Sequence, residues 1–442
     1  MTKKKSLLSS NRRTVLKKLG AIGIASTGLV STTAAAADTK KDKFVSVGEA
    51  KRVAEQMIPH YGKTDSEFKP WQRGSPGSPT KYYTHTTDGG YDPAAYVFPV
   101  VGRGSSKEAL GYITISARRT WAPVLEYSTA KPPGTRQESA KEKAQAMGDS
   151  PSGRLLYQGG VSYGVELSGQ EMVHLGTHQK MVTRPDSDIL GYDDDKQAVD
   201  THARWENATK NSVSGMGTIA GSGSNQVGMT DYVWDAHVGD GVSGSDTGNG
   251  TGNRNDCSGC LGLDDDPWKD WDGCIPIAGT QIVMYHENIE NTYSNRGKRE
   301  KICDELHMEM KTGDDHSTKF KNIPGGFQDL NLTFVDNEYG ANQELLISKN
   351  LFTSDIDKGQ PLMINRPSDI CNWGVCIESE TGDDVDTSSK DKDSYDGHTV
   401  VAAGYQNGGD TLEVFTSWDT NRHNISYGSW GSRTQVTRVW TK

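Results

Sequence analysis

The Gly/Ser-rich stretch SVSGMGTIAGSGSNQ, residues 212–226, constrains the fold of this 442-residue chain more than any other feature. Segments of this composition behave as flexible linkers, because they bury little apolar surface and keep many backbone conformations open. We therefore expect residues 212–225 to separate two folded regions, named here the first block (residues 38–211) and the second block (residues 226–442). Exposed linkers are also preferred sites of proteolytic cleavage.

Residues 1–37 predict a targeting segment that belongs to neither block. A basic head with Arg12 and Arg13 precedes a weakly apolar run and small residues up to Ala37. This order indicates a twin-arginine signal peptide, and the apolar run is too short to span a membrane. Its removal changes the formal net charge from −10 to −17, because it carries seven Lys and Arg residues and no acid. We therefore expect a secreted, soluble, acidic protein that does not bind nucleic acid.

Apolar patterning predicts an α+β fold. In the first block, residues 47–61 carry apolar side chains at helical spacing, and runs at 94–101, 110–127 and 159–168 predict strands. In the second block, a helix beginning near Cys274 precedes four strand-like runs: QPLMINRP, HTVVAAGYQ, TLEVFTSWD and TQVTRVWT. Helices and strands that are segregated along the chain in this way are typical of α+β domains.

Cys274 lies where a glycine turn meets a predicted helix, in WDGCIPIAGTQIVMYHE (residues 271–287). Pro276 fixes the start of this helix, because proline is tolerated in a first turn and disrupts later turns. A thiol at a helix N-terminus lies near unpaired N–H groups and the positive end of the helix dipole, which favour the thiolate. Cys274 is therefore a candidate nucleophile, and the alternatives are a buried small side chain and one half of a disulfide.

His398 is a candidate general base for this thiol. It follows Gly397 at the beginning of the predicted strand HTVVAAGYQ, a position from which an imidazole can point into a cleft. A third group is needed to orient the imidazole. Asp419, at the end of the next strand, is the favoured candidate because a carboxylate stabilises imidazolium, and Thr416 is the alternative.

These stretches resemble papain-fold cysteine peptidases, in particular bacteriocin-leader-processing peptidases and peptidases of the streptopain type. GCIPIAGTQIVMYHE is similar to their nucleophile helix, GHTVVAAGYQ to their histidine strand, and VFTSWD to the strand that supplies Asn or Asp. The resemblance implies a papain-like domain in which a helix carries Cys274 and an antiparallel sheet carries His398 and Asp419. These would act as nucleophile, base and orienting group, without a metal or cofactor.

The first block adds to this resemblance. YVFPVV and LGYITISARRTWAPVLEYSTAKPP are similar to the prodomain of streptopain-type peptidases. The resemblance implies that residues 38–211 are an inhibitory propeptide. The chain would then be a zymogen whose partners are its own propeptide and a protein or peptide substrate. An unrelated binding domain is the alternative.

The sequence departs from the family pattern at two places. Trp268 stands where these peptidases usually carry a Gln that donates to the oxyanion, so Asn255 or a backbone amide of residues 264–273 would have to replace it. Aligning VFTSWD with the family's Asn-Ser-Trp-Gly places Thr416, rather than Asp419, at the orienting position.

Five further cysteines leave their pairing open. Cys257 with Cys260, and Cys371 with Cys376, are spaced for local or crossed disulfides or for a zinc site, while Cys303 would stay free. Three functions fit the sequence. They are a cysteine endopeptidase, a thiol amidase or cell-wall peptide hydrolase on the same fold, and an inactive binding protein whose candidate nucleophile is tied into a disulfide.

Overall fold

The computed structural model describes large parts of both blocks. It covers residues 43–102, 108–183, 201–208, 225–226, 274–312, 318–345, 349–366, 398–416, 421–427 and 435–442, apart from positions 169, 177, 179, 202, 203, 207 and 291. Lys43–Lys442 forms one compact unit. The predicted signal peptide and, apart from Asn225, the predicted linker lie outside the described residues.

The first block combines helices with short strands, as its apolar pattern predicts. Its helices are α2 (Val47–Thr64) and α3 (Gln137–Ala146), with 3-10 turns at Lys69–Arg73 and Pro133–Arg136. Its strands are β1 (Ser75–Pro76), β2 (Thr80–His85), β3 (Tyr91–Val101), β4 (Ala109–Ser116), β5 (Val124–Ser128), β6 (Leu155–Tyr157), β7 (Tyr163–Glu166), β8 (Glu171–His174) and β9 (Lys180–Val182). The run at 110–127 forms two strands, β4 and β5.

The second block begins with helices and ends with strands. Its helices are α6 (Cys274–His286), α7 (Arg296–Glu309), α8 (Ile323–Gln328) and α9 (Lys349–Ile356), with 3-10 turns at Tyr293–Asn295, Phe320–Asn322 and Asn407–Gly409. Its strands are β10 (Asn225–Gln226), β11 (Tyr339–Leu345), β12 (Leu362–Arg366), β13 (His398–Gln406), β14 (Thr411–Phe415), β15 (His423–Ser426) and β16 (Gln435–Thr441).

One sheet runs through both blocks. Its strand order is β11-β16-β12-β13-β14-β15-β5-β4-β3-β2-β6-β7-β8-β9, with β1 paired to β3 and β10 to β13. Among the described pairs, β2 with β6 is parallel and the others are antiparallel. The blocks join where β15 pairs with β5, with His423 opposite Ser128 and Ile425 opposite Glu126. Backbone pairing therefore holds the two blocks together.

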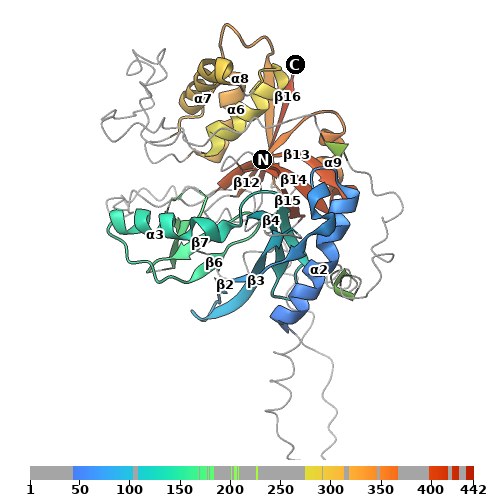
Figure 1. The fold of residues 1–442 in the computed structure, drawn as a ribbon. Coiled ribbons are helices and arrows are strands. Elements are labelled where there is room, and N and C mark those ends of the chain that lie inside the picture. Colours follow the sequence, from blue (N-terminus) through green and yellow to red (C-terminus); the bar gives the residue numbers. More distant parts are fainter. Residues whose placement is uncertain are drawn as a thin grey trace, which may run out of the picture. The chain divides into compact units, whose positions relative to one another are not determined.

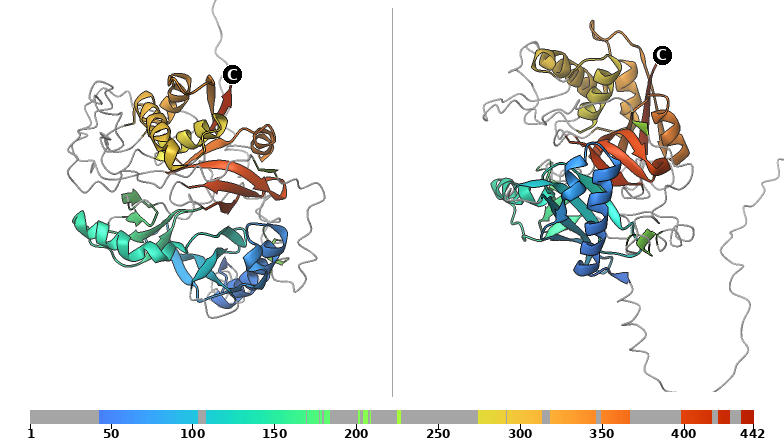
Figure 2. Two further views of the ribbon diagram at one scale, coloured as in Figure 1. Left: turned by 45° about the horizontal axis from the view of Figure 1, so that its top comes forward. Right: turned by 45° about the vertical axis from the view of Figure 1, so that its right-hand side comes forward.

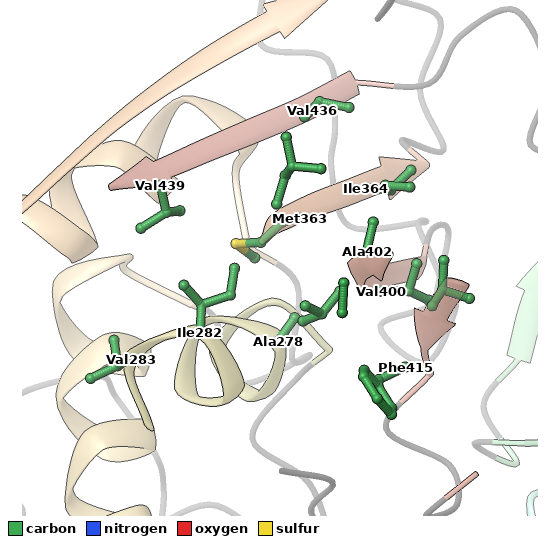
Figure 3. Close-up of a cluster of buried hydrophobic side chains, with 14 of the residues drawn as sticks. Ala278, Ile282, Val283, Met363, Ile364, Val400, Ala402, Phe415, Val436 and Val439 are labelled. Carbon is green, nitrogen blue, oxygen red and sulfur yellow. The ribbon is translucent and has the colours of Figure 1, made fainter. Parts of the chain in front are cut away.

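Helices cover the sheet in both blocks. Figures 1 and 2 show α6, α7 and α8 grouped together in the second block and α2 lying along β3 and β4 in the first. The main apolar cluster of the second block includes Ala278 and Ile282 of α6 and Met363 of β12 (Figure 3). Helices packed on one large mixed sheet make this a mixed α/β structure. Among the described helices, none combines the length and apolar character needed to cross a bilayer.

Candidate active site

Helix α6 begins at Cys274, as the position of Pro276 predicts. Pro276 is the third helical residue, so its missing N–H falls within the first turn, where N–H groups have no partner in the helix. The Cys274 side chain is not part of a disulfide bond and is only 4 % exposed. The thiol therefore sits at the positive end of the helix dipole, which favours its ionised form.

Strand β13 begins at His398, which is also 4 % exposed. The strand pairs with β12 on one side and β14 on the other, and α6 packs directly against it. Cys274 and His398 are therefore the first residues of two elements that contact each other. A nucleophile and its base must lie on neighbouring elements of this kind to come within hydrogen-bond reach.

One face of β8, in the first block, packs against His398 and against the buried cluster that contains Cys274. The imidazole centroid of His174 lies 6.1 Å from that of His398, with the ring planes inclined by 31°. Met172 belongs to the buried cluster that contains Cys274. Side chains two residues apart in a strand point to the same face and lie about 7 Å apart. One short patch of β8 therefore lies against both His398 and the Cys274 cluster.

Two further strands and one loop of the first block extend this cover. Leu156 of β6 and Met181 of β9 belong to the Cys274 cluster. Val161, in the loop between β6 and β7, is part of the main apolar cluster of the second block. Its φ of 53° is uncommon for a β-branched residue, and its N–H donates to Glu126 Oε2 at 2.9 Å. The loop is therefore held in a strained conformation with Val161 inserted into the second block.

His174 is neutral in this environment near neutral pH. Burial lowers its pKa well below 6.5, and the charges of His398 and Arg136 lower it further, while a backbone hydrogen bond with Val161 acts in the opposite direction. Its Nδ1 accepts a hydrogen bond from the Gly176 N–H at 3.1 Å. A neutral imidazole therefore packs against the candidate base.

Of the two candidates for orienting His398, Thr416 lies within the described residues. It directly follows β14 and is fully buried. Continuing the register in which Val401 faces Phe415 puts Thr416 opposite Val400, two residues along β13 from His398. Thr416 thus lies on the strand neighbouring the candidate base.

The other predicted groups fall outside the described residues. Asp419, the favoured orienting residue, is among them, and so are Trp268, Asn255 and residues 264–273, which concern the oxyanion donor. The structure therefore describes two of the three predicted catalytic residues.

Of the five remaining cysteines, one lies within the described residues and four lie outside them. Cys303 of α7 is not part of a disulfide bond and belongs to the Cys274 cluster. Four others, Cys257, Cys260, Cys371 and Cys376, lie outside the described residues. Within the part of the chain that the structure describes, no group of three or more His, Cys, Asp or Glu residues is arranged to hold a metal ion.

The first-block residues at the site carry no local sequence signal. The stretch GQEMVHLG does not alternate regularly between polar and apolar side chains, and no local pattern reveals which element a strand packs against. His174 could therefore be found only from the pairing of distant strands. The same holds for His423, which contacts Glu126 of β5 across the joint between the blocks.

No family model matches the chain, and no curated protein matches it.

Proposed function

We propose that this protein is a secreted cysteine endopeptidase with a papain-like second block, made as a zymogen whose first block covers the active site. The observation that carries the proposal is that one face of β8 lies against both the Cys274 cluster and His398. A thiol at a helix N-terminus and an imidazole at the start of the adjoining strand are the two groups that thiol-based acyl transfer needs.

In the proposed reaction, the Cys274 thiolate attacks the carbonyl carbon of the scissile peptide bond. The Cys274 backbone N–H is the first donor to the resulting oxyanion. His398, which holds the thiol proton, transfers it to the leaving amine as the C–N bond breaks and a thioester forms. His398 then takes a proton from water, whose oxygen attacks the thioester and releases the carboxylic acid and the thiolate. Thr416 or Asp419 orients the imidazole.

The proposed inhibitory role of the first block rests on the extent of its contacts with the second. Besides the β5–β15 pairing, the guanidinium of Arg422 lies 2.7 Å from Asp65, 2.8 Å from Glu67 and 3.0 Å from Glu413. The Tyr127 hydroxyl donates to Gln406 Oε1 at 3.0 Å. A substrate cannot approach a thiol that is 4 % exposed, so the first block must move before peptide hydrolysis begins.

Casein hydrolysis by three matched chains tests this function. Wild type and Cys303→Ala should both clear casein after maturation, because Cys303 is buried but plays no part in the proposed reaction. Cys274→Ala should not clear it, because no other group in the proposed mechanism forms the thioester. Equal clearing by all three chains, or clearing by none, would contradict the peptidase proposal.

A further inference from the structure

Two histidine rings from different blocks meet at the candidate site. His174 of β8 is 1 % exposed and His398 of β13 is 4 % exposed, with ring centroids 6.1 Å apart. Protonating both rings would put two positive charges in a buried contact, where the effective dielectric is far lower than in water. The contact therefore depends on the protonation state of its two members.

The surroundings of His174 carry further positive charge. Arg136 and His178 both lower its pKa through their charges. Arg136, Lys131 and His423 line a small cavity together with His174. The Glu126 carboxylate contacts residues that line this cavity: it accepts hydrogen bonds from the Val161 N–H and the Tyr163 hydroxyl and lies 3.4 Å from His423 Nδ1.

We propose that His174 is an acid-sensitive latch on the active site. When neutral, it packs on His398 and holds β8 over Cys274. When it is protonated, the two rings and the neighbouring cations repel one another, and β8 moves away together with the first block. This inference rests on the proposed function, in which the first block is the cover that must be removed.

The direction of the pH effect follows from proton linkage. A histidine whose pKa is lower in the covered state than in the released state binds fewer protons when covered. The covered state is therefore favoured above about pH 6.5, the usual histidine pKa, and is progressively lost as the pH falls below it. For one such histidine, the release equilibrium can rise by at most about thirtyfold by pH 5.

Two carboxylates at the Arg422 contact act in the opposite direction. Burial raises the pKa of Glu67 and of Glu413, although Arg422 partly offsets this. Their protonation favours the covered state as the pH falls toward the usual range of glutamate, near 4.5. His174 begins to take up protons at higher pH than these carboxylates, so release should dominate between about pH 6.5 and pH 5.

Labelling of Cys274 by 2,2′-dithiodipyridine, which reacts with thiols in acid, measures release without requiring catalysis. The full chain is labelled briefly between pH 7.5 and pH 5, labelling of Cys274 is quantified by peptide mass mapping, and rates are normalised to a free thiol at each pH. The variants are His174→Gln, which keeps an acceptor for the Gly176 N–H, and His174→Phe, which keeps a ring. The matched control is His85→Gln, a buried histidine beside Glu166 whose pKa burial also lowers.

We expect wild type and His85→Gln to gain about tenfold or more in labelling rate between pH 7.5 and pH 5, and the His174 variants less than about threefold. An equal gain in the His174 variants, with their thermal midpoints at pH 7.5 close to that of wild type, would overturn the latch. Constantly fast labelling in folded His174→Gln would support it, since the cover would then be lost at every pH.

This readout separates the two proposals. Acid-dependent labelling without casein hydrolysis at any pH would contradict the peptidase function and leave the latch standing. Casein hydrolysis with wild-type labelling that does not change with pH would contradict the latch and leave the peptidase function standing.

Discussion

At the scale of the residue, Glu126 links the two blocks. It is fully buried, and its carboxylate accepts hydrogen bonds from the Val161 N–H at 2.9 Å, from the Tyr163 hydroxyl at 2.8 Å and from the Tyr112 hydroxyl. His423 Nδ1 lies 3.4 Å from Glu126 Oε1. The two oxygens of this side chain therefore act as acceptors for one backbone N–H and two hydroxyl groups.

Glu126→Gln should accordingly destabilise the protein. The amide NH₂ would face donors and leave at least one of them without an acceptor, at a cost of about 1–3 kcal/mol. Thermal unfolding at pH 7 measures the change. Glu138→Gln is the control, because Glu138 is 79 % exposed and its pair with Lys141 is worth little. An unchanged midpoint for Glu126→Gln would contradict the need for two acceptor oxygens at this position.

The sequence predicts those residues of the site whose position is marked by neighbouring residues in the chain. It misses those that reach the site only through contacts between strands far apart in the chain. Cys274 begins α6 because Pro276 restricts the helix start, and the apolar run after His398 predicts β13. His174 follows from neither rule, because its contact with His398 depends on how strands far apart in the chain are arranged.

At the scale of the element, apolar patterning predicts some helices and strands correctly and misses others, and α2 is one that it predicts. The predicted helix at 47–61 is confirmed as Val47–Thr64, begun by Ser46, whose hydroxyl accepts a hydrogen bond from the Glu49 N–H at 3.2 Å. The run at 110–127 divides into β4 and β5, because the chain turns between Ser116 and Val124. Helix α7 escapes prediction, since RGKREKICDELHME is largely charged and its apolar stripe is short.

Replacing either of two glycines in α2 by alanine should change the stability of the protein, in opposite directions. A Cβ at Gly62 would lie 2.2 Å from Gln72 N and 2.7 Å from Trp71 C, both backbone atoms, so Gly62→Ala must push the 3-10 turn away. We expect a loss of at least about 1–3 kcal/mol. A Cβ at Gly48 meets nothing within 4 Å, and Gly48→Ala should stabilise by about 0.5–1 kcal/mol. Chemical denaturation compares the two, and a shift of the same sign in both would contradict the packing of α2.

At the scale of the whole molecule, one sheet and a cluster of charged side chains join two regions that the sequence presents as separate. Strand β15 is too short to be recognised in the sequence, and no local pattern reveals that it pairs with β5. Arg422, between Asp65, Glu67 and Glu413, adds charge contacts to this joint. In the proposed zymogen the first block covers the site, so activation would require the two blocks to separate at this joint.

The rate at which iodoacetamide alkylates Cys274 at pH 7 tests the central claim most directly. For this measurement, a protease recognition sequence is inserted within residues 212–225, and alkylation is followed by peptide mass mapping before and after the first block is cleaved off and removed. We predict slow alkylation in the uncleaved protein and a rate at least about tenfold higher afterwards, as expected for an uncovered thiol at a helix N-terminus. An equally slow rate before and after removal would contradict both the cover and the thiolate.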